Sequence, residues 1–157
     1  YCGDDNIIVF CYPDGNYFYF EKYRNDLGEK MDNQLFKSIV DMERASVVIC
    51  NLEHEILYMN PAAIERYQKR GGAQLIGKSL LNCHNDHSKG IIWKVIDWFL
   101  EDDSHNMIYT YYNEKENKDV YMVALRNEQK QLIGYYEKHE YRTKETAVLY
   151  DFSKSLV

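Results

Sequence analysis

Two short apolar runs that lie close together form the clearest hydrophobic pattern in this chain. Residues 46–50 and 56–59 are mostly β-branched or aliphatic, and the polar stretch 51–55 separates them. Short apolar runs bounded by polar residues predict strands, so this segment predicts a β-hairpin. The sequence Asn60-Pro61-Ala62-Ala63 follows directly, and a proline there favours the start of a short helix over 62–68. Gly71 and Gly72 then end that helix.

Helical periodicity predicts three longer segments. Residues 31–42 carry apolar side chains on one side of a helix, with Asp32 as a candidate cap. The clearest helix begins at Asn85 or Asp86 and continues to about residue 101. Its apolar face comprises Ile91, Ile92, Val95, Ile96 and Phe99. A weaker stripe predicts a C-terminal helix over 143–156, through Val148, Leu149, Phe152 and Leu156.

Three further strands are predicted after the long helix, over 107–112, 119–125 and 131–138, and their short polar connections favour an antiparallel meander. Residues 6–12 and 17–23 predict another hairpin, because Pro13-Asp14-Gly15-Asn16 is a strong turn signal. The order of elements predicts an α+β fold: a five-stranded antiparallel sheet with helices on one face, an N-terminal β-hairpin and flanking helices. We expect residues 1–28 to form the hairpin extension, and residues 29–157 to form the domain with its flanking helices.

Net charge argues against some classes of binding partner, and the cysteine content indicates the cellular compartment. The formal net charge is −6 and the basic residues are scattered, which argues against nucleic acid or an anionic membrane surface as partner. No apolar run approaches the roughly 18 residues that a membrane span needs, and the N-terminus lacks the order of a signal peptide. The cysteines are widely spaced and lie mostly in apolar surroundings, which indicates reduced, buried thiols: Cys2, Cys11, Cys50 and Cys83. We expect a cytoplasmic protein.

The hairpin that leads into Asn60-Pro61-Ala62-Ala63, followed by the step Leu75-Ile76-Gly77, resembles the opening half of a PAS domain. The order of elements agrees with that family over roughly residues 34–140. Residues 74–84 look like those of small stand-alone bacterial PAS proteins, some of them from Firmicutes. The chain departs from the family in two places: residues 52–55 replace the usual Asp-Gly between the first strands, and the usual aromatic residue after Gly71-Gly72 is missing.

The resemblance implies a sensory, signal-transduction or protein-interaction module without catalysis of its own. In this family, flanking helices commonly pair protomers, so a homodimer is expected, with a downstream signalling protein or a small molecule as further partner. Ligands of the family lie between the long helix and the inner face of the sheet. Matched by position, the pocket here comprises Val48, Cys50, Met59, Ile92, Val95, Ile96, Tyr109, Tyr121, Val123 and Tyr135. The alternative is that these side chains only fill a core.

Cys83, His84 and His87 form the densest group of reactive side chains. As a zinc site, the group lacks a fourth ligand at a recognised spacing. As a haem site, it offers His84 or His87 as axial ligand, since some PAS domains hold haem through a histidine in roughly this region. As structural residues, Cys83 would be a core thiol, and the two histidines would cap the helix that follows.

Two other roles for Cys83 follow from its neighbours. Asn82-Cys83 resembles the Asn-Cys of light-sensing PAS relatives, in which an arginine after the cysteine pairs with the flavin phosphate; here His84-Asn85-Asp86 supplies no such cation, so flavin is disfavoured. Nucleophilic catalysis with the adjacent His84 is disfavoured because neighbouring side chains generally point apart. Three hypotheses remain: a noncatalytic sensory module with an unidentified ligand, a haem-binding redox or gas sensor, and an enzyme that uses Cys83.

Overall fold

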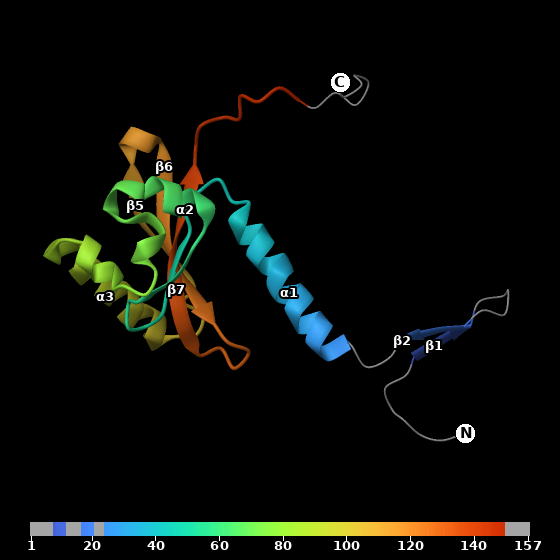
Figure 1. The fold of residues 1–157 in the computed structure, drawn as a ribbon. Helices are drawn as coiled ribbons and strands as arrows, with labels where there is room; N and C mark the ends of the chain where they lie inside the picture. The colour runs from blue at the N-terminus through green and yellow to red at the C-terminus, as the bar shows by residue number, and fades with distance from the viewer. Residues whose placement is uncertain (1–7, 12–16, 21–23, 150–157) are drawn as a thin grey trace. The chain divides into compact units, whose positions relative to one another are not determined.

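The computed structural model describes residues 8–11, 17–20 and 24–149, with side chains from residue 33 onward. The chain divides into two compact units, residues 1–43 and 44–157 (Figure 1). The first contains an antiparallel hairpin of β1 (Ile8–Cys11) and β2 (Tyr17–Phe20), followed by α1 (Arg24–Asp41). The predicted turn over 13–16 lies outside the described residues. Asp32, proposed as a helix cap, lies inside α1, because residues before it also adopt helix.

The second unit contains the predicted sheet. Its strands are β3 (Val48–Cys50), β4 (Ile56–Met59), β5 (Met107–Asn113), β6 (Lys118–Arg126) and β7 (Leu132–Tyr141). They lie in the order β4-β3-β7-β6-β5, and every neighbouring pair is antiparallel. The pairing of β3 with β7 joins the early hairpin to the later meander. The structure therefore confirms the α+β class and the five-stranded antiparallel sheet.

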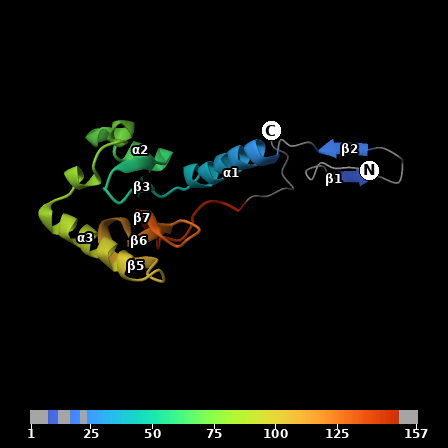
Figure 2. The same cartoon turned by 90° about the horizontal axis from the view of Figure 1, so that it is seen from below.

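Helices cover one face of this sheet. They are α2 (Pro61–Arg66), three short 3-10 turns (Gln68–Arg70, Gly72–Leu75 and Leu80–Cys83) and α3 (Asp86–Glu101). Figure 2 shows the same elements from below, with the short 3-10 turns connecting α2 to α3. A fourth 3-10 turn, Glu114–Glu116, connects β5 to β6. None of the described helices is long and apolar enough to cross a membrane.

Asparagine side chains cap α2 and α3. The buried Asn60 accepts hydrogen bonds at Oδ1 from the backbone N–H of Ala63 and Val47, each at 2.9 Å, and donates from Nδ2 to the carbonyl of Ala45 at 2.9 Å. It therefore fixes the start of α2 against the residues that lead into β3. Asn85 accepts from the N–H of Ser88 at 2.9 Å, which sets the start of α3 at the predicted position.

The core lies between α3 and the sheet. One face of α3 is buried there, through Ile92, Val95, Ile96 and Phe99. The sheet contributes side chains to the same cluster from four strands: Cys50, Met59, Met122, Leu132 and Tyr135. This agrees with the apolar face read from the sequence, except that Ile91 is 41 % exposed.

The C-terminal helix predicted over 143–156 does not form in its described part. Residues 143–149 adopt neither helix nor strand, and residues 150–156 lie outside the described residues. Val148 and Leu149 are 95 % and 91 % exposed. A short helix is marginal in water unless an apolar face packs against something, and here no described residue covers this stripe.

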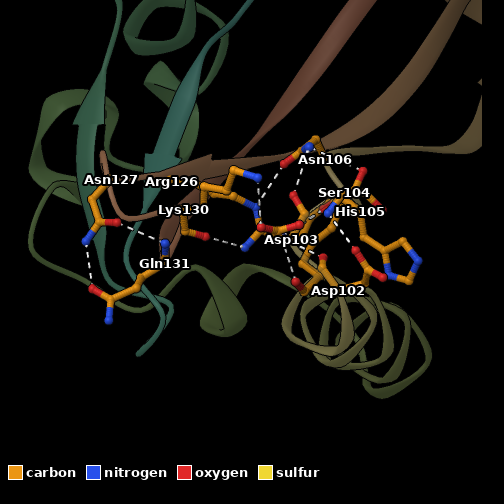
Figure 3. A network of polar contacts seen from close by, with 10 residues as sticks. Asp102, Asp103, Ser104, His105, Asn106, Arg126, Asn127, Lys130 and Gln131 are labelled. Atoms are coloured by element: carbon orange, nitrogen blue, oxygen red, sulfur yellow. Dashed lines mark hydrogen bonds and ion pairs between the residues drawn. The ribbon is translucent and has the colours of Figure 1, made fainter.

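Arg126 ties the end of α3 to two loops (Figure 3). Its Nη2 donates to the carbonyls of Phe99 at 2.6 Å and of Asp102 and His105 at 3.1 Å. Its Nε donates to the Asn106 side chain at 2.9 Å. One guanidinium thus satisfies carbonyls at the end of the helix that the helix itself cannot pair.

Gly134 of β7 is required by a close approach of two strands. A Cβ at this position would lie 2.5 Å from the backbone carbonyl oxygen of Cys50 in β3. We expect Gly134→Ala to lower the free energy of unfolding by about 1–3 kcal/mol, because the strands must separate to admit the methyl group. Urea unfolding monitored by circular dichroism measures this change.

Gly90→Ala is the matched control, since a Cβ there meets no atom within 4 Å in the middle of α3. The same measurement should show a gain of about 0.5–1 kcal/mol, because alanine stabilises helix interiors relative to glycine. An equal stabilisation by both substitutions would contradict the packing of β3 against β7.

Candidate functional site

A cavity of about 460 Å³ lies between the inner face of the sheet and the segment from α2 to α3. Its volume is in the range of small-molecule sites. One part of its wall is apolar and comes from both layers: Val48, Ile56, Met59, Leu75, Ile92 and Met122. The other part is polar and includes Tyr67, Arg70, His84, Tyr111, Glu137 and His139. The arrangement suits a ligand that has an apolar body and a polar end.

A row of charged and polar side chains supports the polar wall from behind. Lys118 is only 1 % exposed, and its Nζ lies 3.1 Å from Glu116 Oε2 and 3.3 Å from His139 Nδ1. Arg66 pairs with the same Glu116 through Nη1 at 2.8 Å and Nη2 at 2.5 Å. On the cavity side, His139 Nε2 lies 2.6 Å from Glu137 Oε1. We call these five residues the polar ladder.

The polar ladder fixes the direction of each hydrogen bond. A lysine ammonium can only donate, so His139 Nδ1 must accept the bond from Lys118. The ring proton is then on Nε2, which donates to Glu137. At the other end, the hydrogen bond from Arg66, reinforced by Lys118, lowers the pKa of Glu116 to about 2. The hydrogen bond from His139 in turn orients Glu137 at the cavity wall.

Three side chains of the polar wall, His84, Tyr67 and Tyr111, have pKa values shifted in the direction that favours their neutral forms. Burial lowers the pKa of His84, and Glu137 and Arg70 act on it in opposite directions. Burial raises the pKa of Tyr67 and of Tyr111, and the charge of Glu137 raises both further. The two phenols therefore remain protonated and can donate to a ligand, while the His84 imidazole can accept or donate.

An irregularity in β5 decides which tyrosine reaches the cavity. The register shifts between Tyr109 and Tyr111, so that Tyr109 lies opposite Tyr121 and Tyr111 lies opposite Val120. At the shift, Thr110 donates from Oγ1 to the Val120 carbonyl at 2.9 Å. An extra residue in one strand turns the following side chain to the other face. Tyr111 therefore lines the cavity together with Thr110, whereas Tyr109 does not line it.

The structure distributes the ten sequence-predicted pocket residues among three places. Four line the cavity: Val48, Met59, Ile92 and Tyr135. Three lie in the apolar core and do not line the cavity: Cys50, Val95 and Ile96. The other three lie on the opposite face of the sheet: Tyr109, Tyr121 and Val123. Tyr109 of β5 is paired with Tyr121 of β6, and Val123 follows two residues further along β6. The rings of Tyr109 and Tyr121 pack there, with centroids 5.3 Å apart.

Cys83, His84 and His87 all line the cavity at its helical side. Cys83 and His87 are exposed, whereas His84 is half-buried. The interpretation of Cys83 as a core thiol is therefore wrong, and Asn85 rather than a histidine caps α3. Within the described part of the chain, no group of three or more His, Cys, Asp or Glu side chains is placed to hold a metal ion.

Apart from His84, sequence reasoning did not find the polar wall, although one signal for part of it was present. Tyr135 was placed on the inner face, and side chains two and four residues further along a strand share its face. Glu137 and His139 follow from that alternation. For Tyr67 and Arg70, on segments without a regular period, the sequence carries no such signal.

Tyr135 links the cavity wall to the loop between β3 and β4. Its hydroxyl lies 2.9 Å from His54 Nδ1, and the His54 ring stacks on Trp93 of α3 with centroids 5.9 Å apart. Tyr135 also shares a hydrogen bond with the buried Cys50 thiol. Burial raises the pKa of Cys50 to about 12, which makes this thiol inert near neutral pH.

Comparisons with known proteins concern the fold. Neither a protein-family model nor a curated protein matches the chain. A C-terminal domain from Streptococcus mutans is 14% identical and has a TM-score of 0.54, over 87% of this chain and 93% of that one. A PAS domain from Colwellia psychrerythraea is 16% identical with a TM-score of 0.52, over 73% and 99%. At such identities the likeness shows the fold alone.

The two described free thiols should differ sharply in reactivity. We expect iodoacetamide at pH 8 to alkylate the exposed Cys83 first, because the raised pKa of Cys50 reduces its thiolate fraction roughly a thousandfold at this pH. Peptide mass mapping over time measures both rates, and Cys83→Ser confirms the assignment. In urea the two sites should react alike; equal rates in the native protein would contradict the burial of Cys50.

Proposed function

We propose that this chain, whose residues 44–149 have the PAS fold, is a sensory signal-transduction domain that binds a small ligand in its central cavity. The single observation that carries this proposal is the cavity of about 460 Å³, with an apolar part and an oriented polar wall. A domain whose inner sheet face served only as a core would bury apolar side chains there. Here the buried Lys118 supports His139, which in turn holds Glu137. This polar arrangement suits a ligand-binding wall better than a hydrophobic core. No catalytic step of its own is part of the proposal.

The signal would leave the cavity along β7. This strand contributes Tyr135, Glu137 and His139 to the wall and continues directly into the C-terminal segment. Just after β7, Arg142 forms a bidentate pair with Asp119 of β6, at 2.5 and 2.6 Å. A ligand that binds one arrangement of this edge better than another shifts the population between them, and with it the position of the flanking segment.

Pairing of two protomers through flanking helices stays a prediction. In its own unit, α1 exposes the apolar side chains Leu35, Phe36 and Ile39, and Met42, directly after the helix, is exposed as well. A second copy of the same helix is the partner that these apolar side chains would suit in a homodimer.

The scattered basic residues give no support for an electrostatic interaction with nucleic acid.

Haem is a second candidate ligand, because two imidazoles line the cavity. His84 is half-buried, and its lowered pKa keeps a nitrogen lone pair available as an axial ligand near pH 7. Haem held there would supply gas-binding or redox chemistry. The protein would contribute His84 or His87 as ligand, the apolar wall around the macrocycle, and Arg70 as the cation for a propionate.

Native mass spectrometry of gently purified protein tests the proposal. We expect a bound small molecule that denaturation releases, and enhanced fluorescence of the apolar probe 1-anilinonaphthalene-8-sulfonate (ANS) on binding. Met122→Trp, which fills the cavity, should lose both signals, whereas Met107→Trp should not, because Met107 is 51 % exposed and does not line the cavity. A bare polypeptide without ANS binding would contradict ligand binding. A Soret band that His84→Ala or His87→Ala abolishes would select haem.

A further inference from the structure

We infer that the ligand of this cavity is a small zwitterion with an apolar body, the chemical class of apolar or aromatic α-amino acids. Its amino group would lie against Glu137 and its carboxylate against Arg70, with the side chain in the apolar part. The inference rests on the proposed function, since it assigns a ligand class to the same cavity. Four features of the cavity wall carry it.

The first feature is a pair of opposite charges that face one cavity without pairing with each other. Arg70, at the end of a 3-10 turn, and Glu137, on β7, both line the space. Within the described residues, neither forms an ion pair with the other, and Arg70 forms none at all. Both charges act on the pKa of Tyr67 and of His84, so these two neutral side chains lie within electrostatic reach of each.

The second feature is that Glu137 has one oxygen occupied and one available. His139 Nε2 donates to Oε1 at 2.6 Å, and the buried Lys118 holds the histidine from behind. Among the described residues, no donor is placed on Oε2. The protein thus orients the carboxylate through one oxygen, and the side chain is 41 % exposed. A ligand ammonium can therefore reach the other oxygen and donate a charge-assisted hydrogen bond.

The third feature is the position of the apolar compartment. Ile56, Met59, Ile92 and Met122 are buried and line the same cavity as the two charges. Arg70 is exposed, which places it at the mouth. A ligand that enters with its apolar group first therefore keeps its charged end between Glu137 and Arg70, next to solvent.

The fourth feature is charge balance. Arg70 and Glu137 sum to zero, so a bound zwitterion leaves neither charge without a partner when it displaces water. A ligand with only an amino group would cover Arg70 without compensating it, and a ligand with only a carboxylate would do the same to Glu137. Leaving a charge desolvated and unpaired lowers affinity, so the arrangement discriminates against both.

Isothermal titration calorimetry with four probes of one shape tests the inference. The probes are L-phenylalanine, 2-phenylethylamine, 3-phenylpropionate and 2-phenylethanol, which present both charges, the cation, the anion and neither. We expect phenylalanine to bind at least about tenfold more tightly than each of the others, as one charge-assisted hydrogen bond provides.

Two neutralising variants assign each charge to its partner. Glu137→Gln should weaken phenylalanine and 2-phenylethylamine about tenfold. It should tighten 3-phenylpropionate, because the carboxylate that this ligand desolvates without a partner is gone. Arg70→Gln should show the reverse selectivity. The matched controls are Lys69→Gln, beside Arg70, and Glu140→Gln, on the same strand as Glu137. Neither control residue lines the cavity, so affinities should not change.

The outcomes separate the inference from the proposed function. Equal binding of phenylalanine and 2-phenylethanol, or affinities that neither Glu137→Gln nor Arg70→Gln alters, would overturn the zwitterion class while the cavity remains a ligand site. Failure of all four probes in a protein that still binds ANS would also overturn it. Failure of ANS as well, with no bound molecule in the native mass spectrum, would overturn the proposed function itself.

Discussion

A buried ammonium group organises the polar half of this domain. Lys118 is 1 % exposed on the inner face of β6, where an unpaired charge would be strongly unfavourable. Glu116 supplies the opposite charge and His139 supplies a lone pair. Because lysine can only donate, these contacts determine the tautomer of His139 and the side from which Glu137 is held. The orientation of a cavity-facing carboxylate thus depends on a cation that does not itself line the cavity.

The inner face of the sheet is divided between two roles. Toward one end, α3 buries Val95, Ile96 and Phe99 against the strands and completes the apolar core. Toward the other end of the sheet, this face carries the polar ladder. The segment from α2 to α3 lies opposite this end, and the cavity lies between them. β7 passes through both regions, from the core residue Leu132 to His139. A change at the cavity wall therefore acts on a strand that the core also holds.

Periodicity predicted most of the fold, because α3 and the strands of the meander bury regular apolar faces. The Asn85 cap and the antiparallel meander follow from local chemistry and short loops. The candidate site was harder to predict. The register shift at Thr110 turns Tyr111 toward the cavity, and no single residue in the sequence signals this shift. Lys118 resembles any strand-end lysine in sequence; its burial comes from Glu116 and Arg66, which approach through tertiary contacts.

The hydrogen bonds of the polar ladder determine which ring nitrogen of His139 carries the proton. Nuclear magnetic resonance can test this directly. Long-range ¹H–¹⁵N correlation spectra of the histidine rings in ¹⁵N-labelled protein at pH 7 distinguish the two imidazole tautomers. The account predicts a single, fixed tautomer for His139, with its proton on Nε2 and the lone pair on Nδ1 directed at Lys118. A proton on Nδ1, or rapid exchange between tautomers as in a solvated histidine, would contradict it.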